Sequence, residues 1–487
     1  MLQPIIIMSQ MEELKEHSRE ITNLGNISGL LGWDQEVMMP EKGIQARKQQ
    51  KKVLSGIIHD KITSEELENV LEGIDVENLS IEDKAVYREI KRSHERSKKV
   101  SRDLNQKISE KSSKTVKVWQ ESKKEDNFDK VRPHLDELLE LKREYARQID
   151  PNREPYQVLF DDYEPYIPFK DVEAALNKLK EELPPIFNNA AKSNEKFEAD
   201  LDEETKTELC RELSESFGFD FDRGRLDLSS HPFTSGTQFD TRITTRFSDG
   251  LIESILITAH ETGHGLYQQG LKQEHYGTPL GSSRELSIHE SQSRLWENHV
   301  CRSKEFWEFF STNLKEKGIE ASGRELHSIA NQVNEKNITR VKADEVSYHI
   351  HIVLRFELGR KLVNGELEIE ELPEAWNDKM EKYLNIRPES DAEGCMQDIH
   401  WFLGNFGYFP TYSIGSILSA QLFSEAENEI DNLDEKIERG EFGELREWLR
   451  ENIHSKGCLK RSDEMVEELV GGLDADEFVE YLSEKYE

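Results

Sequence analysis

Apolar residues recur every three to four positions along most of the chain, with charged residues between them, as is typical of amphipathic helices. This spacing predicts helices over residues 9–24, 44–58 and 170–217. The stretch 84–128 is long, polar and free of glycine and proline, so it predicts a pair of long, solvent-exposed helices. We find no clear internal repeat or low-complexity linker and therefore expect a single, mostly α domain over residues 1–487.

The pattern changes near residues 218–250, where threonine, isoleucine and phenylalanine alternate with polar residues. Such period-two alternation, interrupted by glycine and serine, predicts two or three short strands that form a small β-sheet. A helix should follow, because apolar residues then recur at helical spacing: Leu251, Ile252, Ile255, Leu256 and Ala259. Ser248 and Asp249 offer N-caps for this helix, and Gly270 stops it.

The helix predicted after these strands carries two histidines four residues apart, His260 and His264, with Glu261 directly after the first. Four residues turn an α-helix by about 400°, so the two imidazoles lie on one face, one turn apart. One Zn²⁺ could bind both, with Glu261 beside it as a base for the bound water. Because a chain with 15 histidines can also contain this pattern by chance, a metal site needs a third ligand.

The next helical segment, residues 283–300, offers that ligand. It contains Glu290, and a short loop through Tyr276–Pro279 would let the segment fold back against the first helix. A His₂Glu set with one open position for water suits Zn²⁺, with Co²⁺ as an alternative. A lone helical glutamate is more often salt-bridged, and His289 is the rival ligand.

The charge balance limits the partners of the protein. There are 98 acidic and 64 basic residues, so the net charge of −34 should repel nucleic acid and anionic membranes. No run approaches 18 apolar residues, which argues against a membrane-spanning helix. The four cysteines are scattered, without a Cys-x-x-Cys pair, as is typical of the reducing cytoplasm.

Several sequence blocks resemble the carboxypeptidase Taq family of metallocarboxypeptidases, and they extend over nearly the whole chain. They are LLGWDQEVMMPEKG (30–43), HPF (231–233), DTRIT (240–244), HETGH (260–264), HESQ (289–292), RVKAD (340–344), GCMQDIHW (394–401) and GYFPTYSIG (407–415). The departures are small: Thr339 stands where the family usually has isoleucine, and Lys342 where glutamate is common. Lys342 could alter the local charge near the substrate.

The resemblance implies a cytosolic enzyme that removes amino acids one at a time from peptides with a free C-terminus. It also implies a homodimer with a mostly helical, two-lobed fold and a deep active-site groove, similar to the neurolysin and angiotensin-converting-enzyme peptidases. The helices of about 9–150 would form one wall or lid of that groove. One divalent metal per chain, Zn²⁺ or else Co²⁺, would be held by His260, His264 and Glu290, with Glu261 as the catalytic base.

Residues in the last two blocks are candidates for stabilising the oxyanion that forms during hydrolysis. Tyr412, Tyr408 and His400 could donate a hydrogen bond to it, and we prefer Tyr412. The alternative is packing, because aromatic residues in such a run are more often part of a core.

An exopeptidase must also bind the terminal carboxylate, for which arginine has the right bidentate geometry. The candidates are Arg340 and Arg242, and for either one the alternative is a structural salt bridge. Asp240 and Arg242 point to one face of the same strand, which favours such a pair there, so we prefer Arg340. His231, beside the rigid Pro232, is a candidate for the wall of the groove.

Three functions are compatible with these residues. The first is a metallocarboxypeptidase of broad specificity, and the second is an oligopeptidase or dipeptidyl carboxypeptidase with the same metal chemistry. These two differ only in the carboxylate pocket. The third is a non-enzymatic peptide-binding scaffold with a structural metal. The presence of Glu261, which only chemistry requires, argues against the third.

Overall fold

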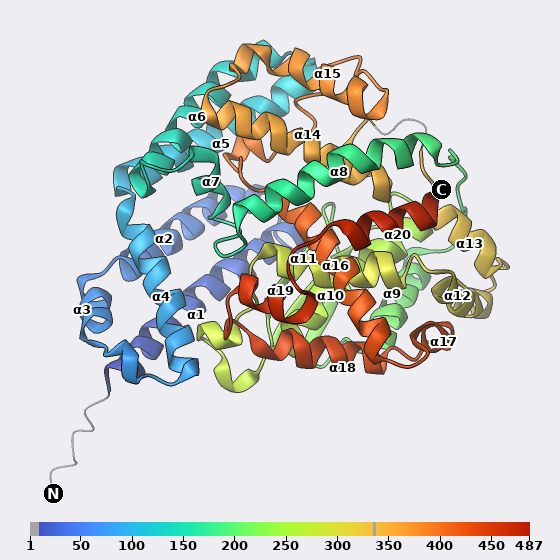
Figure 1. The fold of residues 1–487 in the computed structure, drawn as a ribbon, viewed down its shortest axis with the longest axis horizontal. Helices are drawn as coiled ribbons and strands as arrows, with labels where there is room; N and C mark the ends of the chain where they lie inside the picture. Colours follow the sequence, from blue (N-terminus) through green and yellow to red (C-terminus); the bar gives the residue numbers. More distant parts are fainter. Residues whose placement is uncertain (1–8, 335–337) are drawn as a thin grey trace, which may run out of the picture.

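The computed structural model describes residues 9–334 and 338–487, most of which lie in helices (Figure 1). The first group of helices is α1 (Gln10–Val37), α2 (Ile44–Ile62), α3 (Glu65–Gly73), α4 (Ile81–Lys99), α5 (Arg102–Glu125), α6 (Phe128–Ile149), α7 (Pro155–Phe160), α8 (Phe169–Asn189) and α9 (Glu203–Phe217). Three strands follow: β1 (Gly224–Leu228), β2 (Thr234–Thr237) and β3 (Asp240–Thr245).

The remaining helices form the second part of the chain. They are α10 (Leu251–Gly270), α11 (Leu286–Arg294), α12 (Lys304–Glu316), α13 (Gly323–Ala330), α14 (Glu345–Asn364), α15 (Leu372–Leu384), α16 (Pro410–Glu429), α17 (Leu433–Glu438), α18 (Gly443–Asn452), α19 (Ser462–Val470) and α20 (Asp476–Tyr486). The mostly α class and the small sheet near residues 218–250 are therefore confirmed, whereas the deep groove between two lobes stays a prediction.

The helices predicted over 9–24 and 44–58 are confirmed, and both are longer than predicted. The stretch 170–217 holds two helices, α8 and α9, but residues 190–202 between them are not helical, so that prediction holds only in part. α1 continues beyond the predicted end at residue 24 to Val37, because Trp33 near its end is buried. The polar stretch 84–128 does hold two long helices, α4 and α5. Each buries one face, through Val86 in α4 and Leu104 in α5, so the pair is less exposed than its composition predicts.

Apolar side chains gather in two separate clusters. The larger one extends from Val100 on the loop before α5 to Leu482 in α20. The smaller one joins α1, α3 and α4, through Leu14, Leu67 and Val86 among others. These three helices lie together at the left of Figure 1 and so have a core of their own. The wall or lid predicted over about 9–150 stays a prediction, and its helices α5 and α6 pack into the larger cluster.

The small sheet supports the helix that carries the histidines. Its strand order is β1-β3-β2, with β1 parallel and β2 antiparallel to β3. Ile243 of β3 is fully buried, and Thr258 of α10 donates a hydrogen bond from Oγ1 to Thr245 Oγ1 at 2.9 Å. β3 therefore anchors the first half of α10.

Two glycines let α11 lie very close to its neighbours α10 and α16. A Cβ on Gly263 of α10 would lie 2.6 Å from the carbonyl oxygen of Gln292, and one on Gly415 of α16 would lie 2.6 Å from Cβ of Glu290. Both distances are too short for a side chain, so only glycine permits this packing. The backbone of α11 is consequently held between the two helices at the level of Glu290.

The N-cap predicted for α10 is wrong. The cap residue is Gly250, with φ 116° and ψ 172°, and it makes no side-chain capping bond. Asp249 is instead paired with Arg246 at 2.5 Å. A glycine serves here because the chain must enter the helix from a left-handed φ that disfavours other residues.

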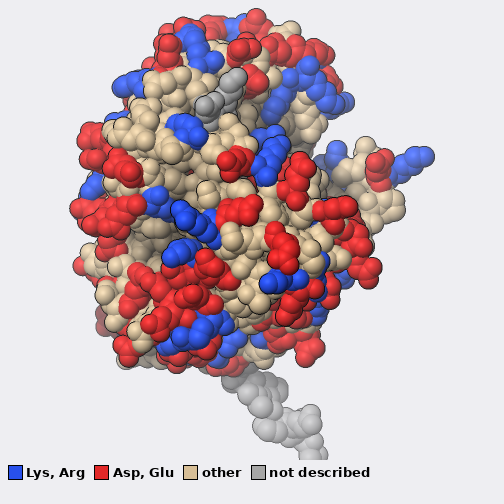
Figure 2. Space-filling model, turned by 90° about the vertical axis from the view of Figure 1, so that its right-hand side faces the viewer, with Lys and Arg blue, Asp and Glu red and all other residues tan. Residues whose placement is uncertain are grey.

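The surface reflects the acidic composition. Figure 2 shows acidic side chains over the whole of the face in view, with lysines and arginines in small groups among them. Separately, we find that none of the helices in residues 9–334 and 338–487 combines the length and the apolar character needed to cross a membrane.

Candidate metal centre

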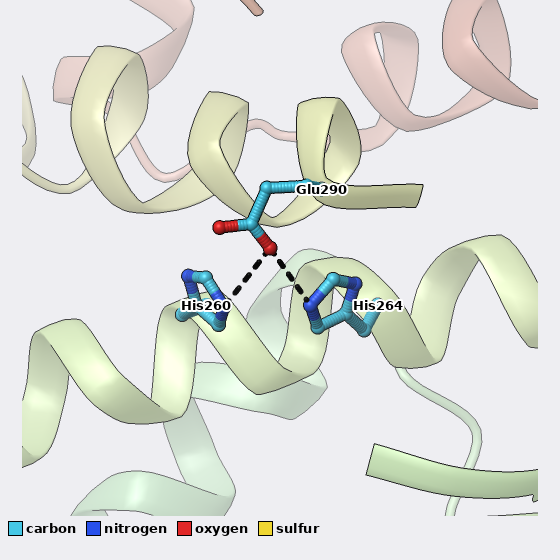
Figure 3. A group of neighbouring side chains, drawn as sticks. All are labelled: His260, His264 and Glu290. Atoms are coloured by element: carbon cyan, nitrogen blue, oxygen red, sulfur yellow. Dashed lines mark ion pairs between the residues drawn. The ribbon is translucent and has the colours of Figure 1, made fainter. Parts of the chain in front are cut away.

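Two neighbouring helices bring His260, His264 and Glu290 together (Figure 3). The imidazoles stand one turn apart on α10, with ring centroids 4.9 Å apart. Glu290 points between them from α11, and its Oε2 lies 3.6 Å from His260 Nε2 and 3.4 Å from His264 Nε2. The predicted loop brings α11 back against α10 as expected.

These three side chains fit a tetrahedral metal ion. Ligand atoms about 2.1 Å from a common centre lie about 3.4 Å apart, close to the two distances observed. Arg294 occupies the other oxygen of Glu290, since its Nε donates to Oε1 at 2.8 Å. Only Oε2 then faces the histidines, which suits a monodentate ligand.

The charges around Glu290 keep it ionised. Burial alone would raise the pKa of this carboxyl, but Arg294, His260 and His264 outweigh burial and hold the pKa well below its usual value. A carboxylate must be deprotonated to bind a metal, so the site is prepared for a cation. A second group that could hold a metal, Glu13, His17 and Glu66, lies on α1 and α3, where Glu66 is exposed.

Each histidine of the cluster has a partner for its other ring nitrogen. His260 Nδ1 lies 2.8 Å from Oε2 of Glu297, and His264 Nδ1 lies 2.6 Å from Nδ1 of His289. Burial and the neighbouring His264 lower the pKa of His289 well below its usual value, so this ring is neutral and can accept a hydrogen bond. His289, the rival ligand, thus lies behind His264 and leaves both Nε2 atoms facing Glu290.

Glu297 is ionised as well. Burial opposes this, but Arg294 and the hydrogen bond from His260 hold the pKa of Glu297 at about 2. A carboxylate accepts hydrogen bonds only, so His260 must carry its proton on Nδ1. In the neutral ring Nδ1 is therefore the protonated nitrogen. Burial lowers the pKa of His260, but the carboxylates of Glu290 and Glu297 outweigh burial and raise it above its usual value.

Glu261 lies on the sheet side of α10 and is mostly buried. The Oγ1 of Thr234 in β2 is 2.6 Å from Glu261 Oε2 and 2.9 Å from the Glu261 carbonyl oxygen. One oxygen of the predicted base is thus bonded by a strand residue.

The three candidates for oxyanion binding form one aromatic group. The ring of Tyr412 lies 5.2 Å from that of Tyr408, and Tyr412 Oη lies 3.4 Å from His400 Nε2. Burial raises the pKa of Tyr408 to about 12 and that of Tyr412 well above its usual value, so both hydroxyls keep their protons. Burial also lowers the pKa of His400 to about 4, which leaves it neutral.

Arg340 lies next to this aromatic group, with its guanidinium 5.3 Å above the ring of Tyr412. It forms a bidentate pair with Asp398, at 3.1 Å from Nε and 2.8 Å from Nη2, and its Nη1 donates to Tyr348 Oη at 3.0 Å. Arg355 binds the same carboxylate at 2.8 Å. Two arginines share one aspartate, so the group carries one positive charge in excess.

Arg242 lies on the sheet and His231 on the loop beside it, rather than in this group. Arg242 forms a bidentate pair with Asp240, at 2.9 and 2.8 Å, and lies 4.2 Å above the ring of Trp33 from α1. The Asp240 partner predicted from the strand spacing is confirmed. His231 is exposed on the bend before β2.

Sequence reasoning missed several residues that contact these candidates, among them Thr234, Arg294, Glu297, Tyr348 and Asp398. Two of them carried a detectable signal, since Arg294 and Glu297 follow Glu290 by four and seven residues and so share its face of a helix. Thr234 lies 27 residues from Glu261 in sequence, so no local pattern indicates their contact.

A helical fold that brings two histidines, one turn apart, to a buried glutamate is typical of metallopeptidases, and comparison with known proteins agrees. The family model of the carboxypeptidase Taq (M32) metallopeptidases matches residues 13–486. Thermostable carboxypeptidase 1 of Pyrococcus furiosus is 37% identical over 96% of both chains. Thermostable carboxypeptidase 1 of Thermus thermophilus is 35% identical over 98% of both chains.

The solved structure of Pyrococcus furiosus carboxypeptidase superimposes with a TM-score of 0.94, at 35% identity, over 99% of this chain and 100% of that one. The chain therefore belongs to the carboxypeptidase Taq (M32) family of metallopeptidases. It is a metallocarboxypeptidase, as the resemblance implied.

Proposed function

We propose that this enzyme releases single amino acids, with broad side-chain specificity, from the free C-termini of peptides. One divalent ion is held by His260, His264 and Glu290. The observation that carries the proposal is the His₂Glu group, whose ligand atoms have tetrahedral spacing and whose glutamate is buried and ionised. We take the ion to be Zn²⁺, with Co²⁺ as the alternative, because both suit a His₂Glu set.

When bound, the ion would lower the pKa of a water ligand toward 7 and polarise the scissile carbonyl. Glu261 accepts the proton of that water as the water attacks the carbonyl carbon, and then gives it to the leaving amine. Thr234 donates a hydrogen bond to Oε2 of Glu261, which restrains the rotation of the carboxylate.

The oxyanion needs a hydrogen-bond donor beside the ion, and we assign this role first to Tyr412. Its hydroxyl is protonated at neutral pH, and it lies between His400 and the guanidinium of Arg340. Tyr412→Phe is therefore expected to lower kcat about a hundredfold with little change in KM, because one oxyanion donor contributes on the order of 10²–10³ in kcat. Steady-state kinetics on one peptide measures this.

Tyr408→Phe is the matched control for Tyr412→Phe, since both variants remove one buried hydroxyl from the same aromatic group. We expect the smaller loss for Tyr408→Phe. The reverse order would give the oxyanion role to Tyr408, and parent-like rates for both variants would remove tyrosine from it.

The terminal carboxylate of the substrate is assigned to Arg340. Arg340 and Arg355 share Asp398, so an arriving carboxylate meets one uncompensated positive charge. The charge of Arg242 is already balanced by Asp240, whose side chain is 54% exposed to water. Because the protein as a whole carries −34, a local positive charge must offset the general repulsion of an anionic substrate end.

Arg340→Ala is expected to lower kcat/KM on a peptide with a free C-terminus by about tenfold to a hundredfold, since a charged hydrogen bond contributes roughly 1.5–3 kcal/mol. The parent should strongly prefer the free acid over the C-terminal amide of the same peptide, and the variant should lose most of this preference. Product analysis over time should show single amino acids. Asp398 keeps Arg355 as a partner, so we expect the variant to fold.

Arg242→Ala is the control, and it should keep the preference for the free acid. If the preference survives in Arg340→Ala and is lost in Arg242→Ala, the carboxylate role belongs to Arg242. Equal cleavage of acid and amide by the parent would instead mean an oligopeptidase, and release of dipeptides would mean a dipeptidyl carboxypeptidase.

The resemblance also supports a homodimer in the cytoplasm. Burial of all four cysteines as free thiols agrees with a reducing compartment. Metal analysis of the purified protein and its sedimentation behaviour would test the ion and the dimer directly.

A further inference from the structure

The partner of His260, Glu297, lies in an irregular turn directly after α11. This turn, η5 (Leu295–Val300), is π-helical, and the amide of Cys301 donates to the carbonyl of Trp296, five residues earlier, at 2.9 Å. π-helical turns are rare and occur frequently at functional sites. We therefore asked whether this π-helical turn serves the metal group, and Glu297 is the residue of the turn that contacts it.

We propose that Glu297 is a positioning residue that sets the tautomer and orientation of His260 for metal binding. The inference rests on the metal ligands of the proposed function. Its basis is geometric: Glu297 Oε2 lies 2.8 Å from His260 Nδ1, on the side of the ring away from Glu290. With the proton fixed on Nδ1, the lone pair of Nε2 points toward Glu290 Oε2 and is free for a metal.

Two arginines hold the carboxylate of Glu297 in place. Nη1 of Arg294 donates to its Oε2 at 3.1 Å, and Nη2 of Arg302 lies 3.6 Å from its Oε1. Arg302 lies two residues beyond the end of the π-helical turn, so the winding between Glu297 and Val300 affects where its side chain points. In a regular α-helix, a residue five positions on has turned by about 500°, to the far side, whereas here the guanidinium of Arg302 comes back within reach of Glu297.

The two histidines of the metal group are supported unequally. The partner of His260 is a carboxylate, whereas the partner of His264 is the imidazole of His289. A hydrogen bond to a charged acceptor is roughly twice as strong as one between neutral groups. Loss of the Glu297 charge should therefore weaken metal binding even though no ligand is removed.

The test is Glu297→Gln, which keeps the size of the side chain but removes its charge. We expect its affinity for Zn²⁺ to fall about 10–100-fold, measured on the metal-free protein by competition with a chelator. The visible absorption spectrum of the Co²⁺-loaded protein should shift as well, because it reports the geometry at the ligands. Neither readout depends on turnover.

Glu345→Gln is the matched control. Glu345 is also a buried carboxylate on which the charge of Arg302 acts, but its hydrogen bonds come from Lys485, Tyr481 and Tyr486 rather than from a metal ligand. Both variants should lower the melting temperature of the metal-free protein, and only Glu297→Gln should change metal affinity and the Co²⁺ spectrum. Equal changes in the two variants, or parent-like binding by Glu297→Gln, would overturn the inference.

Should Glu297→Gln fail to fold, Glu297→Asp keeps the charge between the arginines but withdraws the carboxylate from His260. Weakened metal binding by this variant supports the proposal, and parent-like binding overturns it. Glu290→Ala distinguishes a wrong ligand set from a wrong role for Glu297. If Glu290→Ala keeps its metal, the proposed ligand set is wrong. If Glu290→Ala loses its metal but the Glu297 variants bind metal like the parent, only the proposed role of Glu297 is wrong.

Discussion

Glu261→Gln is expected to lower kcat by several orders of magnitude while the enzyme still binds its metal and its peptide. A glutamine has nearly the size of glutamate, but its amide cannot take up the proton of the attacking water. General acid–base catalysis typically contributes about 10²–10⁴-fold, and Glu261 serves in both the uptake and the return of the proton. The loss should appear in kcat and leave KM close to its parent value.

The hydrogen bond of Glu261 with Thr234 should hold the glutamine of this variant in the same place. The amide oxygen can still accept the hydrogen bond of Thr234, so the side chain should keep its position beside α10. Glu253→Gln, in the first turn of the same helix, is the control and should have parent activity. Kinetics and metal content are measured on both variants. Turnover by Glu261→Gln within tenfold of the parent would remove Glu261 from the mechanism.

The metal group could be predicted because its three residues lie close together in the sequence. Helix geometry alone puts His260 and His264 on one face, and a short connection then brings the following helix, with Glu290, against them. The structure also explains two glycines in these blocks. At Gly263 and Gly415, α11 lies too close to the neighbouring helix for any side chain. Sequence pattern and packing agree at this site.

The surroundings of the site were less predictable, because their contacts join distant parts of the chain. Arg340 meets Asp398 across 58 residues, and His260 meets Glu297 across 37. Periodicity reports which face of a helix is buried, but it does not report which polar groups meet there. The expected salt bridge of Arg242 could be predicted only because its partner Asp240 lies on the same strand.

The incorrect prediction for the start of α10 and the unpredicted π-helical turn also have physical causes. The start of α10 was expected to have a serine or aspartate cap, but the chain turns into the helix through a positive φ, and Gly250 takes the position. The π-helical turn at Leu295–Val300 could not be predicted, since an apolar pattern fits an α-helix and a π-helical turn almost equally over six residues.

Glu290→Ala is expected to lose most of the bound metal, and with it nearly all activity. Three protein ligands hold the ion in the proposed site, and the variant leaves the two imidazoles without the carboxylate ligand. Arg294 remains paired with Glu297 in this variant, so the helix keeps an internal ion pair and the protein should fold. Metal per chain is measured after equilibrium dialysis, with the melting temperature of the metal-free form as the check on folding.

The loss of metal binding can also be measured as a loss of stabilisation by added metal. An ion that binds only the folded parent stabilises it by about 2.7 kcal/mol at a concentration 100 times Kd, so added Zn²⁺ should raise the melting temperature of the parent. Glu290→Ala should show almost no such rise. His289→Asn is the control: because His289 lies behind His264 and not among the ligand atoms, this variant should still gain stability from Zn²⁺, although less than the parent. The opposite result, with metal kept by Glu290→Ala and lost by His289→Asn, would make His289 the third ligand.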